Sequence, residues 1–322
     1  MKAIVIHEVG GPEVLQLRET PVPNPLANEV LVRVEATGVN FIDQYVREGR
    51  YSNRPPFIPG QEAAGTIVSL GSEVTGLSEG ERVAWCSIVG TYAEYAVAPA
   101  DRIVPIPSGV TSMQAAAVLL QGMTAHYLSH SSYPIQIGDE ILVHAGAGGT
   151  GLLLTQMAKA RGARVLTTVS GGEKADLSRK AGADETILYN QLDFAEEVKR
   201  LTDGRGLAVF YDSIGMSTFD QSLACLKARG TLVLYGSAGG DVPPLELMRL
   251  ASLGSLYVTR PVLRDYTRTH EELMTRAAEV FAAVASGTLR LRIEKTLPLK
   301  DAARAHIELA SRSTTGKVLL IP

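Results

Sequence analysis

The sequence predicts an α/β protein that combines a small β-barrel domain with a doubly wound parallel sheet of the Rossmann type. Short alternating strands separated by Gly/Pro turns fill the first hundred residues. Strands and helical stretches alternate from residue 140 to about residue 260, and a glycine-rich turn joins the first such strand to its helix. The 322 residues also exceed one ordinary domain, so two domains are expected.

The amino-terminal region is predicted to be rich in β-strands. Strands are expected at 3–7, 14–19, 29–37, 65–70, 82–85 and 92–98. Apolar and polar side chains alternate over 30–35, as on a strand with one buried face. A helix should begin at Ser112, because apolar residues then recur at helical spacing.

The next region is predicted to form six parallel strands joined by helices. These strands are expected at 140–144, 164–169, 185–189, 207–211, 231–235 and 255–259. The helices should cover 151–161, 173–181, 194–202, 218–228 and 245–251, and Gly162, Gly182 and Gly230 stand where helix C-caps belong. The tail, with helices at 271–286 and 300–311 and strands at 289–295 and 317–321, is predicted to complete the first domain.

The glycine-rich turn has the G-x-G-x-x-G spacing at Gly146, Gly148 and Gly151. The first glycine permits a tight turn, the second lets the backbone approach a pyrophosphate, and the third lets helix and strand pack closely. The amino end of the following helix also favours phosphate. Alone this spacing is a weak signal, but its strand and helix flanks favour dinucleotide binding.

The residues after the second parallel strand bear on the choice of cofactor. A Rossmann domain that prefers NAD usually has an acidic residue about 20 positions beyond the glycines. Ser170 stands there instead, and Lys174 follows. A hydroxyl and a cation suit a ribose 2′-phosphate, which favours NADPH, whereas Glu173 would favour NADH if it faced the ribose.

Composition and motifs disfavour several other functions. The chain is 45% hydrophobic with a net charge of −3, so nothing electrostatic suggests nucleic acid or a membrane as the main partner. Cys86 and Cys225 are the only cysteines, a count that fits a reducing cytoplasm. We expect a soluble cytoplasmic protein, because no apolar run reaches transmembrane length. The histidines form no His-x-x-His or Glu-x-x-His cluster, and no Gly-x-Ser-x-Gly motif is present.

The segment 138–159, which contains the glycine turn, Gln156 and Lys159, resembles the signature of the zeta-crystallin-like quinone oxidoreductases. These are zinc-free members of the medium-chain dehydrogenase/reductase superfamily. The resemblance extends over the whole chain, through 10–15, 38–43, 59–62 and 254–261. It implies a GroES-like catalytic domain, 1–123 with 267–322, a Rossmann NADPH-binding domain, 124–266, and an active cleft between them.

The resemblance also implies a reaction without a metal. The alcohol dehydrogenases of this superfamily bind catalytic zinc, and their ligand positions look like Asn40, Gln61 and Gln121 here. None of these is a good zinc ligand, so no Lewis acid would stabilise an alkoxide. A quinone or enone, in contrast, can accept hydride directly.

The same similarity implies the site residues. Asn40, Phe41, Ile42, Asp43 and Tyr45 would line the nicotinamide side, with Tyr45 and Asn40 as the candidate catalytic residues. Further NADPH contacts are implied for Thr124, Tyr127, Gly148, Gly149, Thr150, Ser170, Gly171, Lys174, Tyr189, Ile214, Gly236, Ser237, Ala238, Gly239, Pro261, Val262, Leu263 and Arg312. Of these, Ser170, Lys174 and Tyr189 look like the 2′-phosphate contacts.

The leading hypothesis is therefore an NADPH-dependent quinone oxidoreductase. An enone or alkenal double-bond reductase is the close alternative, and a non-catalytic NADPH-binding protein, crystallin-like or RNA-binding, is an alternative from another class. The strand 255–259 should end the parallel sheet, and an apolar edge left open is a hazard. We expect it to pair with its copy in a homodimer. The sequence leaves the physiological substrate and the proton source open.

Overall fold

A computed structural model describes all 322 residues and divides them into two compact units. Unit 1 comprises Met1–Met123 and Thr267–Pro322, and unit 2 comprises Thr124–Tyr266. No helix combines the length and apolar character that crossing a membrane requires.

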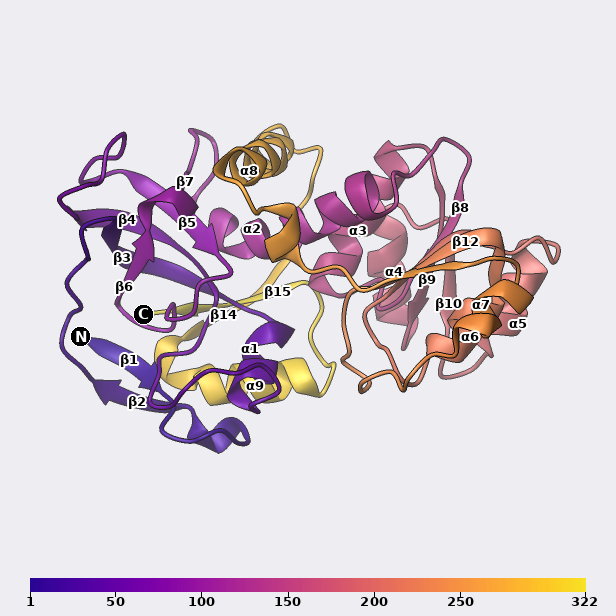
Figure 1. Ribbon diagram of the computed structural model, residues 1–322, viewed down its shortest axis with the longest axis horizontal. Helices are drawn as coiled ribbons and strands as arrows, with labels where there is room; N and C mark the ends of the chain where they lie inside the picture. The colour runs from indigo at the N-terminus through magenta and orange to yellow at the C-terminus, as the bar shows by residue number, and fades with distance from the viewer. The chain divides into compact units, whose positions relative to one another are not determined.

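Unit 1 is built on a mostly antiparallel sheet in which the carboxyl-terminal strands pair with an amino-terminal one (Figure 1). Its strand order is β14 (Ile293–Pro298), β15 (Lys317–Ile321), β3 (Glu29–Val39), β4 (Glu62–Leu70), β5 (Arg82–Cys86) and β7 (Val104–Pro105). β3 also pairs with β6 (Tyr95–Pro99), while β1 (Lys2–Val5) and β2 (Gln16–Glu19) form a separate hairpin. One edge of β3 pairs with β6 near its start and with β15 near its end, which bends the sheet around its core.

Two apolar clusters hold unit 1 together. One lies within the sheet and includes Val32, Ile67 and Trp85. The other includes Ile4 and Leu320, so it joins the beginning of the chain to its end. The helices are α1 (Phe41–Arg47), α8 (His270–Ala285), α9 (Ala302–Ala310) and α2 (Ser112–Tyr127), whose end belongs to unit 2.

Unit 2 is the predicted doubly wound sheet, and its six strands all pair in parallel. The order is β10 (Glu185–Leu188), β9 (Arg164–Val169), β8 (Glu140–Val143), β11 (Leu207–Asp212), β12 (Leu226–Leu234) and β13 (Tyr257–Thr259). The connecting helices are α3 (Gly149–Ala160), α4 (Gly172–Lys180), α5 (Phe194–Leu201), α6 (Phe219–Ala224) and α7 (Leu247–Ser252). The predicted fold class is therefore confirmed.

Two predicted C-cap glycines are confirmed and one is wrong. Gly162 and Gly182 follow α3 and α4 with φ of +84° and +109°, values that favour glycine. Gly230 instead lies inside β12, because α6 ends early and Leu226 already pairs with Leu207. A side chain at Gly230 would crowd the carbonyl oxygen of Leu207, so this glycine permits close strand approach rather than a helix end.

Other element boundaries also differ from the predictions. β14 begins at Ile293 rather than at 289, and β6 begins at Tyr95 rather than at 92. The short helix α1 and a π-helical turn at Leu128–Ser132 were not predicted. Both are shorter than the windows over which helical periodicity can be recognised.

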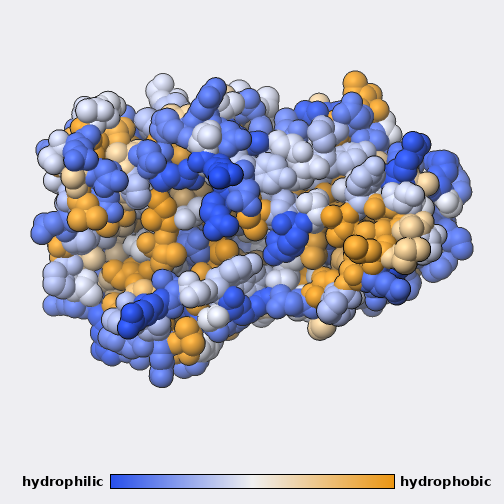
Figure 2. Space-filling model, viewed as in Figure 1, coloured by the Kyte–Doolittle hydropathy of each residue, from blue (hydrophilic) through white to orange (hydrophobic).

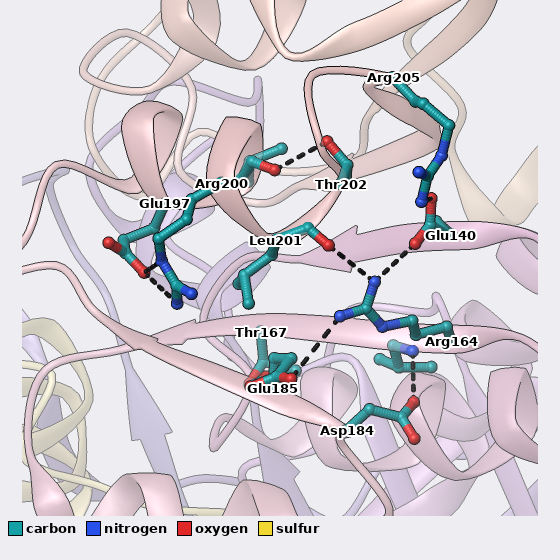
Figure 3. A network of polar contacts seen from close by, with 12 residues as sticks. Glu140, Arg164, Thr167, Asp184, Glu185, Glu197, Arg200, Leu201, Thr202 and Arg205 are labelled. Carbon is teal, nitrogen blue, oxygen red and sulfur yellow. Dashed lines mark hydrogen bonds and ion pairs between the residues drawn. The ribbon is translucent and has the colours of Figure 1, made fainter.

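A charged network lies at the edge of the parallel sheet where β8, β9 and β10 begin (Figure 3). Arg164 Nη1 donates to Glu140 Oε1 at 2.6 Å and to the Leu201 carbonyl at 2.8 Å, while its Nη2 lies 3.6 Å from Glu185 Oε1. Such partly exposed pairs contribute at most about 1 kcal/mol each. The network lies at the opposite edge from the glycine turn, which follows the carboxyl end of β8.

Candidate active site

In the glycine turn after β8, two glycines have no room for a side chain, and the third has more room. A methyl group at Gly146 would clash with Thr167 of β9, and one at Gly151 would clash with the carbonyl oxygen of Ala145. A methyl group at Gly148 would meet only that same oxygen, at 3.2 Å. Gly148 is also the N-cap of α3, so its free side borders a helix amino end that favours phosphate.

The predicted 2′-phosphate residues follow two neighbouring strands. Ser170 follows β9 and Tyr189 follows β10, and the last residues of these strands, Val169 and Leu188, pair with each other. The side-chain amide of Asn190 donates to the Ser170 carbonyl at 2.9 Å, which fixes this turn. Ser170 and Tyr189 therefore lie at one corner of the sheet.

The first turn of α4 adds a cation to this corner. Gly171 is the N-cap of α4, Lys174 lies partly buried in its first turn, and Glu173 is exposed. A cation near a helix amino end opposes the helix dipole, so Lys174 does not stabilise α4 through the dipole. Both the dipole and the ammonium would instead favour a bound phosphate.

The predicted cofactor loops after β11 and β12 are joined by backbone hydrogen bonds. Ala238 N–H donates to the Ser213 carbonyl at 3.1 Å, and Gly239 N–H donates to the Ile214 carbonyl at 2.6 Å. The buried carboxylate of Asp212 accepts the Ile214 N–H at 2.7 Å and so fixes the first loop. A side chain at Gly236 would clash with Ser213, so glycine permits this close approach.

The remaining predicted contacts have different surroundings. Pro261, Val262 and Leu263 follow β13 at the same edge of the parallel sheet. Thr124 and Tyr127 lie on α2, where the Tyr127 ring is 2% exposed and stacks on Tyr266 with centroids 4.3 Å apart. Burial raises the pKa of Tyr127, so its hydroxyl stays protonated. Arg312 belongs to unit 1 and follows α9 with φ of +56°.

The predicted residues of unit 1 surround α1. Asn40 is the N-cap of this helix, and Phe41, Ile42, Asp43 and Tyr45 lie within it. The Arg50 guanidinium lies 4.3 Å from the centroid of the Tyr45 ring, and Tyr45 is largely buried. A tyrosine phenol has the chemistry that a proton donor needs.

Two residues that the sequence did not single out complete a buried cluster with Asn40 and Gln121. Lys317 Nζ donates to Glu62 Oε2 at 2.5 Å and to Asn40 Oδ1 at 2.8 Å. Gln121 Nε2 donates to the same Asn40 oxygen at 3.3 Å. Gln61, the other position compared with zinc ligands, makes no side-chain hydrogen bond to this cluster. A lysine at the start of the apolar strand 317–321 was the available sequence signal.

A second buried chain of hydrogen bonds ends at Asp43. Arg47 can only donate, so His306 Nδ1 accepts from Arg47 Nη1 at 3.2 Å. Burial lowers the pKa of His306 to about 3, and the neutral ring then carries its hydrogen on Nε2. That N–H donates to the Tyr92 hydroxyl at 3.1 Å, and this hydroxyl donates to Asp43 Oδ2, also at 3.1 Å.

The buried side chain of Asp43 caps the amino end of α1. Its Oδ2 accepts the Asn40 N–H at 2.8 Å, whereas Oδ1 is buried without a partner. Burial raises the pKa of Asp43 from 3.8 to about 7, an effect partly offset by the Asn40 hydrogen bond and the nearby charge of Lys317. With its carboxyl fully buried, Asp43 can support the predicted site by holding α1, rather than by contacting a ligand itself.

Asp43→Asn is expected to change the pH dependence of stability. A carboxyl whose folded pKa is raised favours folding below the unfolded pKa, and this contribution is lost as the pH rises through the folded pKa. The free energy of unfolding of Asp43→Asn minus that of the wild type should therefore increase from about pH 4 to pH 7. Urea titrations at several pH values measure it, with exposed Asp203→Asn as the control. A difference that does not vary with pH would contradict the expectation.

Comparisons with known proteins agree with this architecture. Residues 26–108 match the alcohol dehydrogenase GroES-like domain family, and residues 149–279 match the zinc-binding dehydrogenase family. A GroES-like domain joined to a Rossmann domain defines a medium-chain dehydrogenase/reductase.

Relatives that match over their full length identify the family within this superfamily. A quinone oxidoreductase of Pseudomonas aeruginosa is 45% identical, over 100% of this chain and 99% of that protein. The structure of Escherichia coli quinone oxidoreductase complexed with NADPH is 42% identical, covers 100% of both chains and has a TM-score of 0.98. A 2-haloacrylate reductase of a Burkholderia species is 39% identical, over 99% of this chain and 98% of that protein. The chain belongs to the quinone oxidoreductases of the medium-chain dehydrogenase/reductase superfamily.

Proposed function

We propose that this chain is an NADPH-dependent quinone oxidoreductase that works without a metal. The carboxyl edge of the parallel sheet carries this proposal, because it combines the open side of Gly148 with a cationic corner at Lys174. The first suits a pyrophosphate and the second suits a 2′-phosphate. Structural similarity to a quinone oxidoreductase complexed with NADPH supports the same assignment.

The proposed chemistry divides between the cofactor and the chain. When bound, NADPH supplies the hydride, and the quinone also needs a proton to become a hydroquinone. Gly148 would lie against the pyrophosphate, and Ser170 and Lys174 would bind the 2′-phosphate. The hydroxyl of Tyr45 would donate a hydrogen bond or proton to the substrate.

A double-bond reductase remains the second candidate, because the 2-haloacrylate reductase is a full-length relative. Steady-state kinetics with NADPH should compare a series of 1,4-quinones with enones, alkenals and 2-haloacrylates. A higher kcat/KM for the quinones supports the proposal, and a higher value for the alkenes supports the alternative. Binding of NADPH with no turnover of either class would favour a non-catalytic NADPH-binding protein.

Zinc independence is expected because Asn40, Gln61 and Gln121 are amides, which are poor zinc ligands. Lys317 Nζ also lies 2.8 Å from Asn40 Oδ1 and would repel a cation there. Metal analysis of the purified protein should find no stoichiometric zinc, and a chelator should leave quinone reduction unchanged. Stoichiometric zinc that is lost together with activity would contradict this prediction.

A homodimer through β13 is expected from the apolar surface beside it. Tyr257 of β13 is 62% exposed, and Leu247 and Met248 of α7 are 76% and 70% exposed. Figure 2 shows apolar side chains gathered where Figure 1 places α7. β13 is also the last strand of its sheet, so a second β13 could pair with it across a two-fold axis.

Tyr257→Pro should therefore give a monomer or an aggregate, since proline cannot donate a hydrogen bond to a partner strand. Light scattering coupled to size exclusion measures the mass. Ile137→Ser is the control, because Ile137 is 90% exposed and lies outside β13 and α7. A Tyr257→Pro variant that keeps the dimer mass would exclude β13 as the interface.

We further propose a cytoplasmic location. Cys86 and Cys225 are both free and buried, as suits a protein of a reducing compartment.

A further inference from the structure

The hydrogen-bond directions in the cluster of Asn40, Glu62, Gln121 and Lys317 follow from chemistry. An ammonium has donors only, so the Asn40 atom 2.8 Å from Lys317 Nζ must be the amide oxygen. The Asn40 nitrogen then donates to Glu62 Oε2 at 2.9 Å. Because the Asn40 oxygen can only accept, Gln121 must direct its nitrogen toward it, at 3.3 Å. The charge of Lys317 therefore determines the orientation of both amides.

This orientation leaves one atom of the cluster available. The second oxygen of Glu62 accepts the Leu120 N–H at 2.7 Å, and the side chains of Glu62 and Lys317 are 0% and 3% exposed. Gln121 is only half-buried, and its hydrogen bond to Asn40 uses its nitrogen, which leaves Oε1 available. The cluster thus ends in a fixed acceptor oxygen on Gln121.

The fold makes specific room for the charged pair. A methyl group at Gly38 would clash with the Glu62 carboxylate and would lie 2.7 Å from Lys317 Cε. A buried ion pair is weak evidence for stability, because apolar residues of similar volume often serve as well or better. The Glu62–Lys317 pair is better explained by its effect on the orientation of the Asn40 and Gln121 amides.

We propose that Lys317 is a positioning residue that makes Gln121 offer its carbonyl oxygen to the substrate. This inference rests on the proposed quinone reduction. A quinone oxygen has no proton to donate, but it becomes a hydroxyl once the molecule has gained a hydride and a proton. A fixed acceptor on Gln121 therefore binds the forming hydroxyl and not the starting quinone. Such an interaction raises kcat and leaves KM largely unchanged.

Two variants test the proposal. Gln121→Leu removes the acceptor. The paired change Lys317→Met with Glu62→Gln removes the orienting charge without leaving a buried carboxylate unpaired, as Lys317→Met alone would. With 1,4-naphthoquinone, each variant should lower kcat by about 10- to 100-fold, while KM and the Kd for NADPH change little.

A triple variant that combines Gln121→Leu with the paired change tests whether Lys317 acts on kcat through Gln121 or independently of it. Because Lys317 is proposed to act through Gln121, the triple variant should be no slower than the paired one. A triple variant whose loss in kcat equals the product of the two separate losses would overturn the proposal. So would a folded paired variant with the wild-type kcat, or a Gln121→Leu variant that raises only KM.

The orientation can also be tested without activity. If the wild type reduces no quinone, the proposed function fails, and the side-chain amide resonance of Gln121 becomes the readout. The paired change should shift this resonance, whereas an unchanged resonance in the folded variant would overturn the role of Lys317.

Discussion

Lys174→Ala is expected to weaken NADPH binding strongly and to leave NADH binding nearly unchanged. A 2′-phosphate carries close to two negative charges, and an ammonium within hydrogen-bond reach stabilises it through a charge-assisted contact. Loss of a hydrogen bond to a charged group typically costs about 1.5–3 kcal/mol, or roughly 10- to 150-fold in affinity. NADH has only a hydroxyl at this position, so it loses no such contact.

Fluorescence titration with each cofactor measures this effect. Lys180→Ala is the matched control, because Lys180 lies in the last turn of the same helix and is exposed. High salt should partly reproduce the loss in the wild type through screening. If the wild type prefers NADH, or if Lys174→Ala weakens both cofactors equally, Glu173 is the residue that reads the ribose.

The parallel sheet could be predicted because its signals are local. Buried parallel strands are near-continuous apolar runs, and Gly162 and Gly182 end the helices between them. Gly230 shows where local reasoning fails. A glycine after a helical stretch suits a helix end or a close strand approach equally well, and only the pairing of Leu226 with Leu207 distinguishes them.

The buried cluster could be predicted only in part because its contacts are distant in sequence. Asn40 and Gln121 stood out through their resemblance to zinc-ligand positions, but Glu62 and Lys317, which are 255 residues apart, share no local pattern. Asp43 was expected beside a nicotinamide because the family resemblance implied it. Its burial depends on Tyr92 and on His306 of α9, and no local pattern predicts that contact.

Gly148→Ala and Gly151→Ala should have opposite consequences, although they change the same turn. A methyl group at Gly148 meets one backbone oxygen, at 3.2 Å, and would face the proposed pyrophosphate, so this variant should fold and bind nucleotide weakly. Forcing an extra methyl group into a packed contact typically costs about 1–3 kcal/mol, or roughly 5- to 150-fold in affinity. Both NADPH and NADH should be affected, because they share the pyrophosphate.

Gly151→Ala should instead destabilise the protein, because its methyl group would collide with the carbonyl oxygen of Ala145 and push α3 away from β8. Thermal unfolding should show a melting temperature several degrees below that of the wild type, whereas Gly148→Ala should melt close to it. The three variants report on different functions of this region. Gly148→Ala tests the pyrophosphate contact, Lys174→Ala tests the 2′-phosphate contact of NADPH alone, and Gly151→Ala tests folding. A Gly148→Ala variant that binds both nucleotides as tightly as the wild type would show that the pyrophosphate lies elsewhere.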